Sequence, residues 1–567
     1  MCLCIHLGAL TSAIFLFRQP FLFTVKIVKN NMGQQLQSLD YAVFLIYFVI
    51  VTSYGYWIYQ RKKAAETSAS DFFLAEGALT WWAIGASLIA SNISAEQFIG
   101  MSGSGFAMGL AIASYEWMAA LTLIVVAVFF MPGYITNKIY TMPQFLEKRY
   151  SPLVATMMAV FWLLVYVFVN LTSILYLGAI AISTISGFSF TACTVFIAIF
   201  AIVITLGGMK VIGYTDVIQV TILVLGGLAT TYLALDLVAQ QFGTQGALAG
   251  IGFLGEQAPG HFEMIFDESN PHYKDLPGLT VLIGAMWIAN LNYWGCNQYI
   301  TQRALGAKLE TARSGLLFAA FLKLLMPIIV VIPGIAAYVL HQKGMFQAEM
   351  MNAAGEVKPD RAYPVLLNLL GPGLKGLSFA ALTAAIVASL AGKANSIATI
   401  FTLDLYKKYM DKNAGEDKQV RIGRWVIIVS MVIAVIVAPQ LQKLEQGFQF
   451  IQEFTGLISP GVVAIFVLGF FWKRATANAA FAAALITIPL GLVFKAWMPE
   501  MPFLNQMGWV FLILVALMAA ISLADPKSKD NPKAMRVDAE MFRTSPTFAI
   551  GALLIIGVLA ALYIVFW

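Results

Sequence analysis

Residues 81–118 read WWAIGASLIASNISAEQFIGMSGSGFAMGLAIASYEWM, and this stretch decides the fold of the chain. It is apolar enough to cross a membrane, yet its middle carries Asn92, Glu96 and Gln97. Glu116 follows in the next apolar segment. Polar and ionised side chains are costly at membrane depth, so they usually face a cavity rather than lipid. The stretch therefore predicts a polar site enclosed by membrane helices.

Small residues surround these polar groups, among them Ala90, Ser94, Gly100 and Gly103, and they permit close packing and an unwound backbone. A helix that breaks at membrane depth exposes carbonyls and amides, which is tolerated only where they line a cavity or are buried in protein. Many transporters build a binding site near the membrane midplane in this way. We therefore interpret the stretch as the centre of a carrier's binding site.

The composition is typical of a membrane protein. Of the 567 residues, 60% are hydrophobic and 11% are charged, and the mean hydropathy is +0.80. Soluble globular proteins carry roughly 25% charged residues. The net charge of +6 does not indicate nucleic-acid binding, because lysine and arginine fall in short connections between apolar runs. The four cysteines show no ligand spacing and are interpreted as apolar filler.

Residues 1–38 are interpreted as an N-terminal extension. Its apolar run is interrupted by Arg18 and Pro20, and Met32 follows. A signal-like segment is one interpretation, but we favour a start site placed too early, with Met32 as the true start. Residues 39–567 are expected to form one transmembrane domain, with a core over about 80–471 and peripheral helices over 41–59 and 476–566.

The fold class that we predict is an all-α polytopic membrane protein. From residue 39 onward, apolar segments follow one another, each long enough for the roughly 20 residues that span a bilayer. We predict about fourteen transmembrane helices, near residues 41–59, 80–106, 109–130, 154–184, 189–207, 216–236, 278–299, 314–340, 375–403, 424–440, 448–471, 476–497, 508–525 and 546–566.

Charge alternates between the connections of these segments. Basic residues gather in 61–63, 138–149, 303–313, 407–424 and 527–543, whereas the loop over 237–277 is acidic. The positive-inside rule puts the basic side in the cytoplasm and both termini on the outer side.

In this topology the second and seventh segments enter the membrane from opposite sides. Each carries a polar interruption, SNISAEQ at 91–97 and NLNYWGCN at 290–297. Matching broken helices in two halves are typical of an inverted-repeat transporter. We therefore predict a core of two five-helix repeats, segments 2–6 and 7–11.

Polar residues within the predicted membrane segments are Asn92, Glu96, Gln97, Glu116, Asn290, Asn292, Lys323, Gln452 and Glu453. Amides donate and accept hydrogen bonds, carboxylates accept and lysine donates, which suits a neutral ligand rich in hydroxyl groups. Bulky neighbours that can cover a sugar ring are Met101, Tyr115, Tyr293, Trp294 and Phe448. For Asn292 and Glu453, a bond between two helices explains the residue equally well.

A cation site needs oxygen ligands. The break in the second segment offers the carbonyls of Ala90 and Ile93, and the ninth segment offers the Ser389 hydroxyl and the Ala385 carbonyl. Unwound backbone carbonyls and half-helix ends coordinate Na⁺ in many transporters. The spacing of these residues permits a Na⁺ site.

With these residues in view, the chain from about 39 to 567 resembles bacterial sodium/galactose (sodium/glucose) cotransporters of the sodium:solute symporter family. The matching motifs are GASLIASNISAEQFIGMSGSG, GLAIASYEWM, FVNLTSILYLG, YTDVIQV, APGHFEMIFDESNP, NYWGCNQYITQR, FAAFLKLLMP and FQFIQEFTGLISPG. The resemblance implies a LeuT-like inverted-repeat core in the bacterial inner (plasma) membrane. It also implies import of a galactose- or glucose-like monosaccharide with Na⁺ by alternating access.

The resemblance further implies roles for individual residues. It implies sugar contacts at Asn92, Gln97, Glu116, Asn290, Lys323 and Gln452. It implies gate residues at Met101, Tyr115, Tyr293, Trp294 and Phe448, with Tyr293 closing the inner side. It implies Na⁺ ligands at Ala90, Ile93, Ala385 and Ser389, and an ion path past Asp216.

Three positions depart from the family pattern. Ala119 and Ala388 replace serines that would contact the sugar and the ion, and Lys393 replaces an apolar residue one helical turn past Ser389. We expect Lys393 to pair with Asp216, because a lysine in a membrane helix normally pairs or snorkels. These departures leave open a proton-coupled or uncoupled carrier on the same fold. A membrane sugar sensor is a second alternative, whereas an enzyme is not expected, since no nucleotide loop, metal cluster or nucleophile–base motif is visible.

Overall fold

The structure is a computed structural model that describes residues 36–63, 80–139, 142–206, 209–305, 307–352, 355–443 and 447–567. Within these ranges the regular secondary structure is helical, apart from one isolated bridge between Met351 and Val357. The predicted all-α fold class is therefore confirmed. Residues 1–35 lie outside the described residues, so our interpretation of the start site stays a prediction.

The helices of the first half are α2 (Ser38–Lys63), α4 (Trp81–Asn92), η1 (Glu96–Met101), α5 (Ser102–Met108), η2 (Gly109–Ala113), α6 (Ser114–Val125), η3 (Val126–Phe130), α7 (Met131–Thr136), α8 (Met142–Arg149), α9 (Pro152–Leu164), η4 (Val165–Leu171), α10 (Thr172–Ser186), α11 (Phe190–Leu206), α12 (Met209–Gln241), α13 (Ala247–Gln257) and η5 (Pro259–Phe262).

The helices of the second half are α14 (Thr280–Ile283), α15 (Met286–Gly295), α16 (Gln298–Leu305), α17 (Leu309–Val330), α18 (Ile332–Gln342), α19 (Gln347–Met350), η6 (Pro359–Arg361), α20 (Ala362–Leu367), α21 (Leu374–Thr399), η7 (Ile400–Met410), α22 (Glu416–Val437), η8 (Ala438–Lys443), α23 (Gly447–Gly456), α24 (Ser459–Phe471), α25 (Ala477–Trp497), α26 (Phe503–Ala524), η9 (Pro526–Ser528), η10 (Ala539–Phe542) and α27 (Pro546–Val565).

The chain is a multi-pass membrane protein. Nine helices in its described part are long and apolar enough to cross a membrane, or up to ten if the bent pair α23 and α24 is one span. Counting by length and apolar composition does not reproduce the predicted number of about fourteen transmembrane helices, because backbone breaks divide some predicted spans into short helices. The span predicted over 278–299, for example, is divided between α14 and α15.

Both predicted interruptions are present. Helix α4 ends at Asn92, Ile93 is extended with φ −67° and ψ 111°, and the chain resumes at Glu96 as the π-helix η1. In the seventh segment, α15 ends at Gly295 and α16 begins at Gln298. A helix end leaves backbone groups without helical partners, and π-helical turns are frequent at functional sites. The broken segments thus leave backbone groups without helical partners next to polar side chains.

Small residues bring these broken helices close to their neighbours. A Cβ atom at Gly85 of α4 would lie 2.7 Å from the carbonyl oxygen of Gly315 in α17. A Cβ atom at Gly100 of η1 would lie 3.0 Å from the Cβ of Phe448 in α23. The predicted close packing is therefore confirmed at Gly100, and Gly85 adds a second close approach. Together they set α4 and η1 directly against two helices that carry candidate site residues.

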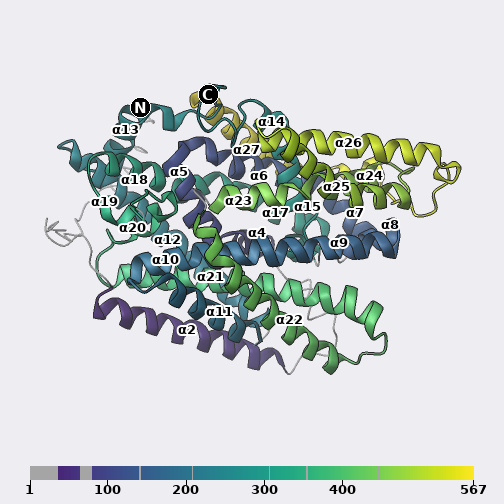
Figure 1. Ribbon diagram of the computed structural model, residues 1–567, viewed down its shortest axis with the longest axis horizontal. Coiled ribbons are helices and arrows are strands. Elements are labelled where there is room, and N and C mark those ends of the chain that lie inside the picture. Colours follow the sequence, from purple (N-terminus) through teal and green to yellow (C-terminus); the bar gives the residue numbers. More distant parts are fainter. Residues whose placement is uncertain are drawn as a thin grey trace, which may run out of the picture. The chain divides into compact units, whose positions relative to one another are not determined.

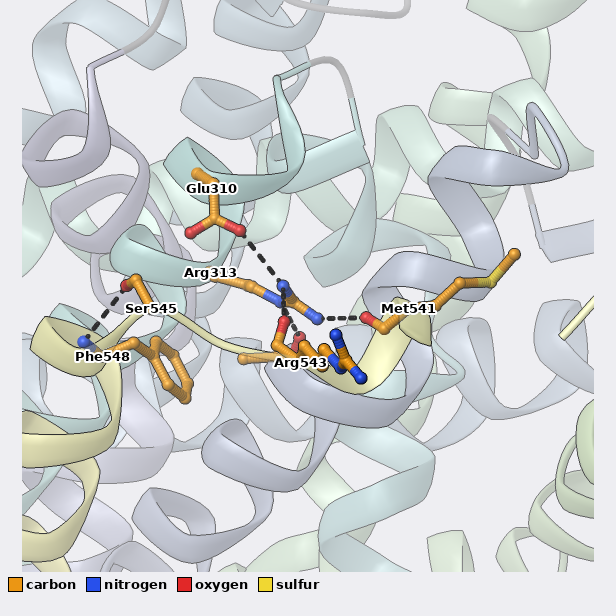
Figure 2. A network of polar contacts seen from close by, with 7 residues as sticks. Glu310, Arg313, Met541, Arg543, Ser545 and Phe548 are labelled. Carbon is orange, nitrogen blue, oxygen red and sulfur yellow. Dashed lines mark hydrogen bonds and ion pairs between the residues drawn. The ribbon is translucent and has the colours of Figure 1, made fainter. Parts of the chain in front are cut away.

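The connections that carry the basic residues meet on one face of the part of the chain that the structure describes. Arg313 is buried and donates to the carbonyls of Met541 at 2.6 Å and Arg543 at 2.8 Å, and it pairs with Glu310 at 3.1 Å (Figure 2). Lys533 likewise donates to the Tyr150 carbonyl at 2.7 Å. These bonds join connections that are far apart in the sequence and that we predicted to lie on one side.

The acidic loop lies on the opposite face, with α13, α19 and α20 at the left ends of the helices in Figure 1. His261 of this loop stacks on Tyr338 near the end of α18, with ring centroids 4.0 Å apart. The backbone amide of Met264 donates to the Phe566 carbonyl at 2.8 Å, so α27 ends on this face. Asp40, in the first turn of α2, accepts from the backbone amide of Gly373 at 2.7 Å, in the connection between α20 and α21. Helix α2 therefore begins on the same face.

Candidate functional site

A cavity of about 100 Å³ collects polar side chains from helices that are distant in the sequence. Its lining includes all the predicted sugar contacts, namely Asn92, Gln97, Glu116, Asn290, Lys323 and Gln452. They stand on α4, η1, α6, α15, α17 and α23 respectively. The structure thus brings together residues that lie as far apart in the sequence as Asn92 and Gln452.

A buried ion pair is the electrostatic centre of the cavity. The Lys323 ammonium lies 2.5 Å from Oε2 of Glu116 and also donates to Oδ1 of Asn92. It lies 5.1 Å from the ring centroid of Trp294. Removing two charges from water is expensive unless they are paired and hydrogen-bonded, and this arrangement satisfies both conditions. The pair places a fixed donor and a fixed acceptor beside each other in the cavity.

The amide side chains keep hydrogen-bonding capacity for a ligand. Gln97 accepts from the Ser94 hydroxyl at 3.2 Å through Oε1, and Asn290 donates to the Met286 carbonyl at 3.1 Å through Nδ2. Each amide offers two N–H donors and an oxygen with two lone pairs. These single bonds therefore do not exhaust either group, and both can bind hydroxyl groups in the cavity.

Asn292 and Glu453 are the two residues for which a bond between helices was an equally good explanation. Asn292 lines the cavity, but its Nδ2 donates to the Ser459 hydroxyl at 2.9 Å and so joins α15 to α24. Glu453 pairs with Lys495 at 2.6 Å near the surface. Both contacts connect helices, which supports the interpretation as packing residues.

Aromatic pairs lie beside the polar groups. The rings of Tyr115 and Phe448 meet edge to face at 5.1 Å between centroids, and Met101 is fully buried in η1. The rings of Tyr293 and Trp294 lie 5.0 Å apart at the end of α15. The next residue of the chain, Gly295, accepts from Tyr134 of α7, which ends beside a basic connection. The Tyr293–Trp294 pair is therefore on the basic side of the cavity.

The predicted cation ligands lie on two elements. Ala90 and Ile93 stand at the break that ends α4, where the last carbonyls lack helical partners, and Ala385 and Ser389 are buried in α21. Carbonyl and hydroxyl oxygens of this kind fit a hard cation such as Na⁺. Asp216 is in α12, but its side chain lies outside the described residues, so its place on an ion path stays a prediction.

Lys393 points into the cavity. It is buried and lines the cavity wall, with its ammonium 5.1 Å from the ring centroid of Tyr166 and 6.0 Å from that of Tyr293. The carboxyl group that acts on it electrostatically is Glu96. We expected Asp216 as its partner, and that pairing stays a prediction because the Asp216 side chain is not described.

Several cavity residues were not assigned from the sequence. Glu96 was noted as polar but not placed among the sugar contacts, and its buried Oε1 has no hydrogen-bond partner within the described residues. Tyr166 of η4 donates to Oδ1 of Asn297 at 2.7 Å, and Asn170 lies one turn further along. A signal was present, because Asn170 is an amide in the middle of an otherwise apolar segment.

Known proteins resemble this chain in sequence and in fold. The sequence model of the sodium:solute symporter family matches residues 72–487. A sodium/glucose cotransporter of Vibrio parahaemolyticus is 49% identical over 545 residues, which cover 95% of this chain and 100% of that protein. Sodium/myo-inositol cotransporter 2 of Sus scrofa is 33% identical over 489 residues, covering 81% of this chain and 70% of the relative.

A solved structure has a similar fold. It is a Na⁺-coupled sialic acid symporter in a substrate-bound, outward-open state, with a TM-score of 0.72 over 86% of this chain and 98% of that one. The sequences are 21% identical, so the likeness concerns the arrangement of the helices.

Proposed function

The chain belongs to the sodium:solute symporter family, and on this premise we propose that it imports a galactose- or glucose-like monosaccharide together with Na⁺. The observation that carries the proposal is the cavity in which Lys323, Glu116 and Asn92 bind one another beside further amide groups. Alternating donors and acceptors match sugar hydroxyls, each of which both donates and accepts.

The charge of the cavity supports a neutral substrate. Two carboxyl groups, Glu96 and Glu116, and two ammonium groups, Lys323 and Lys393, line it. Their formal charges cancel, so a ligand without net charge enters with no unbalanced charge in the site. The relative with 49% identity is named for glucose, which agrees with a neutral hexose as the substrate here.

Each group has a role in the proposed transport cycle. The six predicted contacts, Asn92, Gln97, Glu116, Asn290, Lys323 and Gln452, bind the sugar hydroxyls. Met101, Tyr115 and Phe448 close the site toward the acidic face, and Tyr293 with Trp294 closes it toward the basic face. Na⁺ binds to oxygens of Ala90, Ile93, Ala385 and Ser389, which stabilises the sugar-binding arrangement of the α4 break.

The basic face is proposed to lie in the cytoplasm of a bacterial cell. The start of α2 and the end of α27 then face the periplasm, and transport runs from the acidic to the basic face. We further propose that the helices from α4 to α24 form two inverted five-helix repeats, because α4 and α15 are both interrupted beside the cavity.

Uptake into proteoliposomes tests the proposal. Purified protein is reconstituted, and labelled galactose or glucose is offered with an inward Na⁺ gradient, with equal Na⁺ on both sides, or with an inward proton gradient. We expect accumulation only with the Na⁺ gradient. Accumulation with the proton gradient alone would instead support proton coupling, which Lys393 makes the leading alternative. Sugar binding without uptake under all three conditions would indicate a sensor.

A further inference from the structure

Two lysines of the cavity each face one ring of the same aromatic pair. The Lys323 ammonium lies 5.1 Å from the Trp294 ring, and the Lys393 ammonium lies 6.0 Å from the Tyr293 ring. A carboxyl group accompanies each lysine: Glu116 forms an ion pair with Lys323, and Glu96 lines the same cavity as Lys393. The cavity is therefore built around two cation–aromatic–carboxylate arrangements, of which only the first contains the predicted sugar contacts.

The second arrangement spans two groups of helices. Lys393 stands on α21, which packs against α10, α11, α12 and η4. Tyr293 stands on α15, which packs against α6 and α24. The Lys393 ammonium lies within 6.0 Å of both the Tyr293 ring and the Tyr166 ring of η4, and the Tyr166 hydroxyl donates to Asn297 just past the end of α15. Contacts from α21 and η4 thus hold the end of α15 from the basic side.

We propose that Lys393 is a latch on the inner gate. Its ammonium attracts the faces of Tyr166 and Tyr293 and so holds the end of α15 closed against η4 while the sugar is bound, which slows release toward the basic side. The inference rests on the proposed function, in which Tyr293 covers the sugar on the cytoplasmic side. Lys393 acts through Tyr293 and is therefore a positioning residue rather than a sugar contact.

The physical basis is the low dielectric of the buried site. A cation near an aromatic face is held more strongly when water is excluded, and Lys393 is 5% exposed. Glu96 lines the same cavity, and the attraction of a carboxylate opposes part of the cost of burying the ammonium. Methionine at this position would keep most of the side-chain volume and remove the charge.

The test compares variants by their rate of sugar release toward the basic side. Lys393→Met is expected to speed release of preloaded labelled sugar by roughly 3- to 30-fold, the range that corresponds to a cation–aromatic contact. Lys393→Arg keeps a cation over the two rings and is expected to stay near the native rate. Lys495→Met is the matched control, because Lys495 also lies over a ring, 4.8 Å from Phe454, but outside the cavity.

A native thiol reports where the opening occurs. Cys296 is fully buried in the gap between α15 and α16, three residues past Tyr293, whereas Cys193 is buried in α11. Alkylation followed residue by residue with peptide mass spectrometry should become faster at Cys296 in Lys393→Met. The rate at Cys193 should not change.

The release and alkylation rates together distinguish a latch from an effect on Na⁺ alone. Native protein that neither binds nor transports sugar would remove the proposed function, and Cys296 alkylation would still test the latch. Lys393→Met with native release and native Cys296 alkylation would overturn the latch. The latch would also be overturned if Lys393→Met changed only the Na⁺ concentration for half-maximal uptake, because that result indicates repulsion of the ion. If Lys393→Arg releases the sugar as fast as Lys393→Met does, the latch is also overturned, because side-chain shape and not charge then closes the gate.

Discussion

At the scale of single residues, the cavity depends on paired groups, so the choice of substitution matters. Lys323 contacts both Glu116 and Asn92, and removing one partner of a buried ion pair is strongly destabilising because the other charge remains. Gln97 is neutral and accepts a hydrogen bond from Ser94. A change at Gln97 therefore reports on sugar binding with less disturbance of the fold than a change at Glu116.

We predict that Gln97→Ala loses sugar uptake while the protein remains folded in the membrane. A buried polar contact to a hydroxyl group contributes roughly 1–3 kcal/mol, because its loss leaves a partner unsatisfied. Sugar affinity should fall by roughly 10- to 100-fold. Equilibrium binding of labelled sugar measures the change, and gel filtration checks the fold. Native affinity would remove Gln97 from the site.

Ala119 lines the cavity on α6, one turn from Glu116, where the resemblance implies a serine. We predict that Ala119→Ser tightens binding of the sugar whose hydroxyl the new group reaches. A single added hydrogen bond is worth about 1 kcal/mol, or roughly a fivefold gain in affinity. Galactose and glucose are measured in parallel, and unchanged affinity for both would mean that this wall does not contact the sugar.

At the scale of helices, the interruptions are the part that the sequence predicts best. SNISAEQ places three polar side chains within two turns of an apolar segment, and α4 ends inside it. The π-helical form of η1 was not predicted; Gly100 in this turn packs closely against Phe448 of α23, a contact between distant parts of the sequence that local propensity does not include. The position of Glu96 in the same cavity as Lys393 was not predicted either, because it depends on how η1 and α21 pack together; the pairing of Lys393 with Asp216 stays a prediction.

The start of α23 adds a titratable contact that the sequence did not indicate. Asp360 of η6 is buried against Gly103, and its Oδ2 accepts from the backbone amide of Gly447 at 3.0 Å. Burial raises the pKa of this carboxyl group from 3.8 to about 7. Helix α23 also carries Phe448 and Gln452, so this contact positions both a gate residue and a sugar contact.

We predict that Asp360→Asn removes a pH-dependent loss of stability. In the folded protein the carboxyl group keeps its proton up to about pH 7, whereas the unfolded chain loses it near pH 4. The contribution is therefore fully present below about pH 4 and is lost as the pH rises through 7. The shift of about three pKa units corresponds to at most about 4 kcal/mol.

Thermal unfolding in detergent at pH 5 and pH 8 measures this effect. The advantage of Asp360→Asn over the native chain should grow between the two values. Asp267→Asn serves as the control, since Asp267 is exposed and its pKa is lowered by bonds from Ser269, outside this pH window. Parallel curves for the native chain and Asp360→Asn would contradict the prediction.

At the scale of the whole molecule, the charge pattern of the connections predicted which ends of the helices lie together. Arg313 binds carbonyls of the connection before α27, and the end of α27 meets the acidic loop at Met264 (Figures 1 and 2). The number of spanning helices was less predictable. Hydropathy counts an apolar run as one helix, whereas backbone breaks such as that between α14 and α15 divide it.

Ion coupling is a property of the whole molecule, because the proposed Na⁺ ligands stand on α4 and α21 and transport requires that both respond to the ion. Ala388 precedes Ser389 in α21 and replaces a serine in the resemblance, so one oxygen ligand is lost. A nearby ammonium, Lys393, acts in the same direction by repelling a cation. We therefore expect the native chain to bind Na⁺ weakly.

We predict that Ala388→Ser lowers the Na⁺ concentration for half-maximal sugar uptake by roughly 3- to 10-fold, the effect of one added oxygen ligand of about 1 kcal/mol. Ala384→Ser is the matched control, since Ala384 packs with Tyr47 of α2 and the same hydroxyl group would point away from the α4 break. Lys393→Met should shift half-saturation in the same direction as Ala388→Ser, because it removes the repelling charge. If half-saturation stays the same in Ala388→Ser, this part of α21 does not bind Na⁺. If native uptake ignores Na⁺ and follows a pH gradient, the buried ammonium replaces the ion, and the Na⁺ ligands assigned here are wrong.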